Sequence, residues 1–88
     1  MIITGMEHFQ SVCKNKLVEW YNENNATKID IKDTFVVWSC KALQNYKCIV
    51  STKAHGYGIS AEYTYNGDLR ELYEDVYEKI SNRRIREE

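Results

Sequence analysis

The chain has 88 residues, with 12 basic and 13 acidic side chains, and 43% of its residues are hydrophobic. These values are typical of one ordinary globular domain, and they argue against a disordered tail or a strongly cationic nucleic-acid protein. No window reaches the roughly 18 consecutive apolar residues of a membrane span, and the first residues lack the cationic and apolar regions of a secretion signal. We therefore expect a cytoplasmic protein without a membrane partner.

The first predicted element is an amphipathic helix over residues 6–24. Apolar residues recur at spacings of three or four, and the tract NENN at residues 22–25 ends the pattern with residues that prefer turns. The apolar stripe consists of Met6, Phe9, Cys13, Leu17 and Trp20. After this helix, Ile29 and Ile31 alternate with charged residues, which indicates a short extended lead-in and leaves open whether a strand forms there.

Two strands are predicted next, over residues 35–43 and 47–52, because β-branched and aromatic residues dominate both. A three-residue loop, Gln44-Asn45-Tyr46, gives the cleanest separation of apolar and polar side chains. In that register the core side collects Val36, Trp38, Cys40, Ala42, Cys48 and Val50. The outer side then carries Ser39, Lys41, Lys47, Ser51 and Lys53.

The rest of the chain predicts one more strand and one more helix. After a glycine-containing turn at residues 53–58, residues 59–65 alternate apolar and polar side chains, which favours a strand. A helix is predicted from the apolar positions Leu69, Leu72, Tyr73, Val76, Tyr77 and Ile80, with Asp68 and Glu71 resembling a capping box.

The predicted fold is therefore α+β, in the order helix, three-stranded antiparallel sheet, helix (α-β-β-β-α), with both helices on one face of the sheet. Residues 6–82 form one domain, and residues 1–5 and 83–88 are loosely attached ends. Double-stranded-RNA-binding domains share this order of elements, but their last helix begins with lysines and the matching DLRELYED is acidic.

No motif predicts a catalytic, cofactor-binding or metal site. The three cysteines are an odd number at spacings that fit neither disulfides nor a metal knuckle, so Cys13, Cys40 and Cys48 are expected to be small buried thiols. A catalytic pair of Cys40 or Cys48 with His55 lacks any supporting motif. We therefore expect a protein that is not an enzyme.

The hairpin and the segment after it resemble a known family. The stretches VVWSCKALQN and YTYNGD, followed by ELYEDVYEK, are similar to a family of short proteins from phages and prophages of Gram-positive bacteria, catalogued as a domain of unknown function. The resemblance covers roughly residues 9–80. It implies a small phage-encoded protein in the cytoplasm of a bacterial host, and it brings no catalytic residues.

Two functions are compatible with these observations. The first is a non-enzymatic accessory protein that binds a protein partner, as an inhibitor or an adaptor of a host or phage protein. The alternative is a weak nucleic-acid-binding domain that uses the basic outer face of the sheet. The candidate binding surface comprises Lys41, Lys47, Lys53, His55 and Tyr57. Seven tyrosines also allow a homodimer, because tyrosine is favoured at interfaces.

Overall fold

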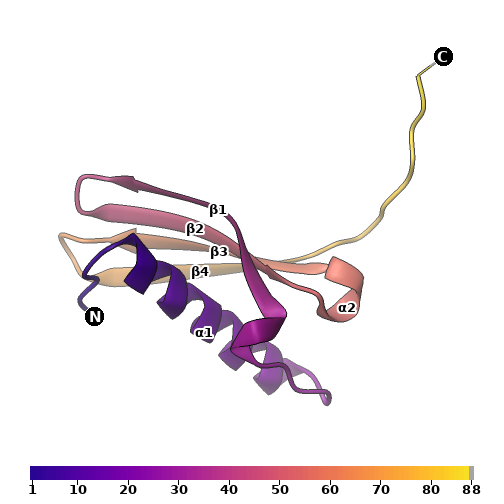
Figure 1. Cartoon of the computed structure of the whole chain (residues 1–88), viewed down its shortest axis with the longest axis horizontal. Helices are drawn as coiled ribbons and strands as arrows, with labels where there is room; N and C mark the ends of the chain where they lie inside the picture. The colour runs from indigo at the N-terminus through magenta and orange to yellow at the C-terminus, as the bar shows by residue number, and fades with distance from the viewer. Residues whose placement is uncertain (88) are drawn as a thin grey trace.

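The computed structural model describes residues 1–87, which form a four-stranded antiparallel sheet with one long helix across one of its faces (Figure 1). The strands pair in chain order, so the sheet is a simple meander. The elements are α1 (Met6–Asn24), η1 (Ile31–Asp33), β1 (Thr34–Ala42), β2 (Asn45–Thr52), α2 (Ala54–Tyr57), β3 (Ile59–Asn66) and β4 (Glu71–Glu78). None of the helices in residues 1–87 has both the length and the apolar character needed to cross a bilayer.

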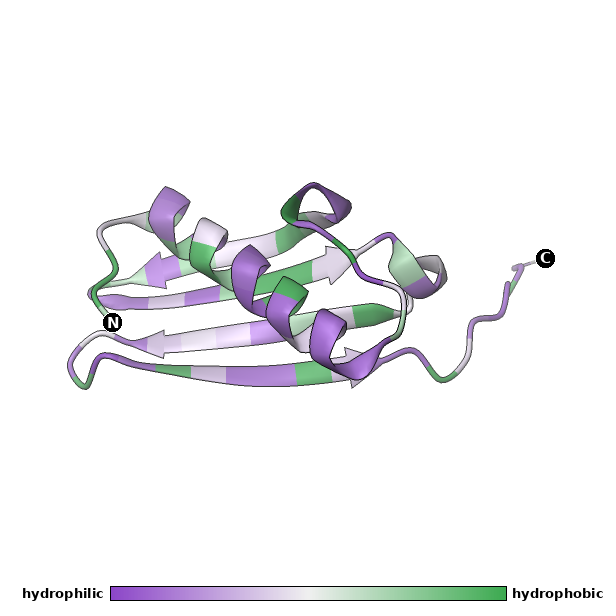
Figure 2. Ribbon diagram, turned by 90° about the horizontal axis from the view of Figure 1, so that it is seen from below, coloured by the Kyte–Doolittle hydropathy of each residue, from purple (hydrophilic) through white to green (hydrophobic). Residues whose placement is uncertain are grey.

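The predicted helix over residues 6–24 is confirmed as α1. Its buried side chains are Phe9, Cys13, Leu17 and Tyr21, one at every fourth position. This spacing keeps all four on one side of the helix, where they join the core. Figure 2 shows α1 lying across the sheet. The sheet supplies the other half of the core through alternate residues of β2 and β3: Tyr46, Cys48, Val50, Ile59, Ala61, Tyr63 and Tyr65.

The segment between α1 and β1 forms a single turn of 3-10 helix, η1, instead of a strand. Asp30 caps this turn, because its side chain accepts a hydrogen bond from the Lys32 backbone and its own backbone N–H donates to Asp33. Ile29 is buried just before the cap. The turn redirects the chain from the end of the helix into the edge strand β1.

The predicted helix over residues 69–80 is wrong, and so is the three-stranded α-β-β-β-α arrangement. Residues 71–78 form the strand β4, which pairs with β3 from Ile59↔Glu78 to Asn66↔Glu71. The stretch LYEDVYE also satisfies a period of two, which turns Leu72 and Val76 toward the core. Pairing with the open edge of β3 therefore decides the conformation, and only α1 covers the sheet as a long helix.

The predicted three-residue loop in the first hairpin is also wrong, since Ala42 pairs with Asn45 and leaves a two-residue loop. Leu43 occupies this loop with φ of 55°, a conformation usually taken by Gly, Asn or Asp. A β-bulge at Val37 then inverts the side chains that follow it in β1. Val36, Cys48 and Val50 do face α1, but Trp38, Cys40 and Ala42 lie on the exposed side of the sheet.

The two hairpin loops at one end of the sheet are joined by direct contacts. Gly67 N–H donates to Asn45 Oδ1 at 3.0 Å, and the Gln44 side-chain amide donates to Asp68. A Cβ atom on Gly67 would overlap the carbonyl oxygen of Gln44. Glycine is therefore needed here for close approach of two loops.

The two ends of the chain differ in how they contact the domain. Ile3 packs against the core, and the Met1 carbonyl accepts a hydrogen bond from Tyr65 at 2.8 Å. At the other end, residues 79–87 have no regular structure and extend away from the sheet (Figure 1). This extension fits the radius of gyration of 14.5 Å, which exceeds the about 12 Å expected for a compact chain of this length. Glu88, part of the predicted loose end, lies outside the described residues.

Candidate functional site: the open face of the sheet

The lysines of the predicted binding surface do not share one face of the sheet. Lys41 pairs with Tyr46 on the side of α1, where its Nζ lies 5.6 Å from the centre of the Tyr46 ring. Lys47 pairs with Cys40 on the opposite side. Because adjacent residues of a strand point to opposite faces, the two-residue loop, which pairs Ala42 with Asn45, separates two lysines that the expected three-residue loop brought together. Lys53 lies beyond the end of β2.

His55 and Tyr57 lie in the turn α2, next to Lys53. Three successive residues, His55, Gly56 and Tyr57, have φ between 53° and 64°, a left-handed conformation that costs free energy in non-glycine residues. Two contacts hold the turn in place. His55 Nδ1 lies 2.8 Å from the Tyr21 hydroxyl, and the Tyr57 ring lies 6.1 Å from that of Phe35. His55 therefore connects this turn to α1, whereas Tyr57 borders the other face of the sheet.

The sheet face opposite α1, named the open face, is not covered by any element of residues 1–87 (Figure 1). It carries an unusual number of exposed rings, with Trp38 49% exposed and Tyr73 and Tyr77 each 55% exposed. Phe35 and Ile49 are half-buried among them. The pairing places Trp38 beside Ile49, and Tyr73 beside Thr64 on the neighbouring strand. Exposed aromatic groups on one surface are typical of protein interaction sites.

The charges of the open face are mainly negative. Lys47 Nζ forms an ion pair with Glu62 at 3.2 Å, so its charge is already compensated. Glu71 accepts a hydrogen bond from the Tyr73 hydroxyl at 2.7 Å, and this contact raises the pKa of Tyr73. Asp75 lies on the same face, opposite Glu62. Three carboxylates against one lysine make this face unsuited to phosphate and suited to a cationic segment.

The sequence pattern predicts a different place for these residues. It puts Tyr73, Asp75 and Tyr77 in a helix and Trp38 in the core. The period of two in LYEDVYE was the signal that could have revealed the strand, because it places Tyr73, Asp75 and Tyr77 on one face. The inversion after Val37 had no such signal, since a bulge has no dependable residue signature of its own.

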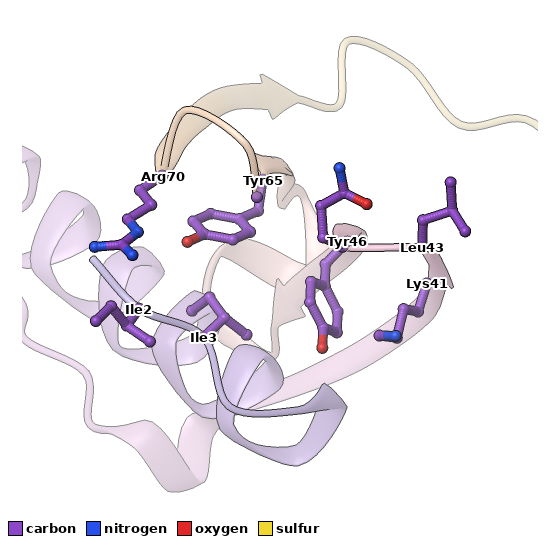
Figure 3. Close-up of a pocket in the computed structure, with 9 residues that line it drawn as sticks. Ile2, Ile3, Lys41, Leu43, Tyr46, Tyr65 and Arg70 are labelled. Atoms are coloured by element: carbon purple, nitrogen blue, oxygen red, sulfur yellow. The ribbon is translucent and has the colours of Figure 1, made fainter.

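Apart from the open face, the protein has a cavity near the N-terminus, with a volume of about 500 Å³ (Figure 3). Its walls include Ile2, Ile3 and Tyr46, and its two charged side chains, Lys41 and Arg70, are both cationic. Figure 3 shows these two cations on opposite sides of the cavity. The arrangement offers apolar surface and positive charge. It does not bring together a nucleophile and a base.

The two buried thiols and the imidazole of His55 are held in structural contacts. Cys13 and Cys48 are buried together, as expected, whereas Cys40 is exposed. The hydrogen bond between the two thiols, together with burial, raises the pKa of the Cys13 thiol. His55 is bonded to Tyr21. Among residues 1–87, no group of three or more His, Cys, Asp or Glu side chains is placed to hold a metal ion.

The comparison with protein families gives one result. A model described as a family of unknown function, DUF6275, matches residues 10–87. The chain belongs to this family. No match was found among curated proteins or among solved structures. The match confirms that the hairpin and YTYNGD lie in a domain of unknown function. The open face described above includes residues of all four strands, and all of them lie inside the matched region.

Proposed function

We propose that this protein is a small phage-encoded accessory protein without enzymatic activity, which acts by binding a protein partner in the bacterial cytoplasm. The observation that carries the proposal is the open face, where Trp38, Tyr73 and Tyr77 are exposed beside an excess of carboxylates. Aromatic side chains provide much of the binding free energy in protein interfaces, because they bury a large area at little cost in conformational entropy.

The chemistry of this face favours one class of partner. A segment with alternating basic and apolar side chains would satisfy Glu71 and Asp75 and would shield the rings from water. Arginine fits best, since its guanidinium group forms paired hydrogen bonds with carboxylates and also stacks on aromatic rings. Nucleic acid fits poorly, because phosphates would meet Glu62, Glu71 and Asp75.

A displayed library of ten-residue peptides, selected against the full chain, tests this proposal. We expect the selected peptides to be enriched in Arg, Lys and apolar residues. The double variant Trp38→Ala, Tyr73→Ala should weaken their binding at least about tenfold, or about 1.4 kcal/mol. Glu23→Ala, on the exposed surface of α1, serves as the matched control and should leave affinity unchanged.

Two outcomes would overturn the proposal. One is a selection that yields no binder, and the other is a set of binders whose affinity is the same for the wild-type chain and the double variant. Circular dichroism of each variant checks that the sheet remains folded, so that lost affinity reports on the face. Acidic peptides as the enriched class would contradict the assignment of partner chemistry.

A further inference from the structure

The C-terminal segment, residues 79–87, has the chemistry that the open face lacks. It carries Lys79, Arg83, Arg84 and Arg86, with Glu87 as its one described acidic residue. Ile80 is 99% exposed and Ile85 is 74% exposed. Large apolar side chains left in water lose the free energy that their burial would provide. The segment is therefore cationic and apolar, which matches the partner class derived for the open face.

The path of the chain directs this segment away from its own sheet. Lys79 is fixed at the end of β4, where its N–H donates to the Gly58 carbonyl at 2.7 Å. From there the segment continues outward and does not turn back over the sheet (Figure 1). To reach its own open face, the segment would have to reverse direction. Without such a reversal it can contact only the open face of another molecule.

The segment is long enough to reach across the open face of a second molecule. Nine extended residues span at most about 30 Å, since each residue contributes about 3.3–3.6 Å. A strand of eight residues is about 27 Å long. One segment is therefore long enough to cross the open face of a second copy along its strands. Two copies related by a two-fold axis can each give a segment and receive one, which closes the assembly as a dimer.

We infer that the open face is a docking site for residues 79–87 of a second copy of this chain, and that the protein forms a reciprocal dimer through these segments. The inference rests on the proposed function, because it identifies the chain itself as one partner of the face. Arg83, Arg84 and Arg86 meet Glu71 and Asp75, and the two isoleucines pack on the rings of Tyr73 and Tyr77 on the same strand.

Charge-reversal variants of the full-length chain test the dimer. Size-exclusion chromatography coupled to light scattering measures the mass of each variant in solution. The tail variant is Arg83→Glu, Arg84→Glu, Arg86→Glu, and the face variant is Glu71→Lys, Asp75→Lys. We expect twice the mass of one chain for the wild type and a dissociation constant raised at least tenfold in either variant. An equimolar mixture of the two variants should recover the dimer, because each acidic tail then meets a basic face and each basic tail an acidic one.

The control is Glu7→Lys, Glu23→Lys, which makes the same charge change as the face variant at exposed positions of α1 and should leave the dimer intact. Raising the salt concentration should weaken the wild-type dimer, because salt screens exposed charges. A monomeric wild type, a dimer unaffected by the tail variant, or a mixture that stays monomeric would each overturn the inference. Peptide binding at the open face in the library selection would still support the proposed function in those cases, so the two failures are distinguishable.

Discussion

The Tyr63 hydroxyl donates a hydrogen bond to Glu74 Oε2 at 2.6 Å, which connects a fully buried core residue of β3 to an exposed carboxylate of β4. The two residues are directly opposite each other in the sheet. This contact provides an acceptor for a hydroxyl that the core has removed from water. It also fixes β4 in the register that exposes Tyr73 and Tyr77.

Removing the acceptor should destabilise the protein. We expect Glu74→Ala to lower the free energy of unfolding by about 1–3 kcal/mol, since the buried Tyr63 hydroxyl loses its partner. Glu74→Gln keeps an acceptor and should cost less. Glu78→Ala, at an exposed position of the same strand, should stay within about 0.5 kcal/mol of the wild type. Urea denaturation measures all three, and equal effects of Glu74→Ala and Glu78→Ala would contradict the assigned role.

The same tyrosine should make stability sensitive to alkaline pH. Burial, followed by the hydrogen bond to Glu74, raises the pKa of Tyr63 above its ordinary value of 10.0. Above pH 10 the unfolded chain releases this proton while the native chain keeps it. The stabilising contribution is therefore complete below that pH and is lost as pH rises, by up to about 1.4 kcal/mol for each pH unit.

Unfolding free energies between about pH 9 and pH 11 measure this effect. Tyr63→Phe should remove this part of the slope, although it lowers stability at neutral pH. Tyr77→Phe, which removes a hydroxyl from an exposed ring, is the matched control and should retain the wild-type slope. The explanation fails if the wild type and Tyr63→Phe lose stability at the same rate.

The cysteines should differ in reactivity. Cys40 is exposed on the open face, whereas Cys13 and Cys48 are buried and their thiols are hydrogen-bonded to each other. Since the side chains of Cys13 and Cys48 are fully buried and the reagent must reach the sulfur atom, we expect iodoacetamide to modify Cys40 alone in the native protein. Mass spectrometry should find all three sites modified after denaturation. Early modification of Cys13 in the native protein would contradict this assignment.

Gly67 should be the glycine least tolerant of a side chain. A methyl group there meets the backbone of Gln44, which cannot move without opening the first hairpin. We expect Gly67→Ala to lower the unfolding free energy by about 1–3 kcal/mol. A Cβ on Gly5 meets no atom within 4 Å, so Gly5→Ala is the control and should change stability little. Thermal unfolding followed by circular dichroism provides the measurement.

The sequence predicted α1 and the strand over residues 59–65 well, because in each segment one period alone fits the apolar residues. In α1 the buried positions Phe9, Cys13, Leu17 and Tyr21 fit a helix and no strand. The stretch of β4 fits both periods. Leu72, Tyr73, Val76 and Tyr77 follow a helix, whereas Leu72 and Val76 with Glu74 between them follow a strand.

The pairing of β4 with β3 decided between the helix and the strand that this stretch allows. It also determined which residues form the open face. In the predicted fold Tyr73 and Tyr77 lie on the apolar stripe of a helix packed on the core side, whereas β4 places both residues on the open face. The two-residue loop placed Trp38 on the same surface, and the bulge at Val37 kept Val36 on the core side. Neither change is visible in composition or in charge. The candidate site could therefore be located only from the pairing of strands.

The order of the strands in the meander has a consequence for how the protein opens. Every strand pairs with its neighbours in sequence, so β1 and β4 are both hydrogen-bonded on one side only. The helix α1 packs against β1 and β2, whereas β4 contributes only Leu72 and Val76 to the core. A strand with few buried contacts can open locally, and the free energy of this local opening is lower than the free energy of global unfolding. Its amide hydrogens then exchange with solvent while the rest of the protein stays folded. Among the strands, amide exchange is therefore expected to be fastest in β4. When β4 detaches from β3, Tyr73 and Tyr77 leave the open face while α1, β2 and β3 remain folded.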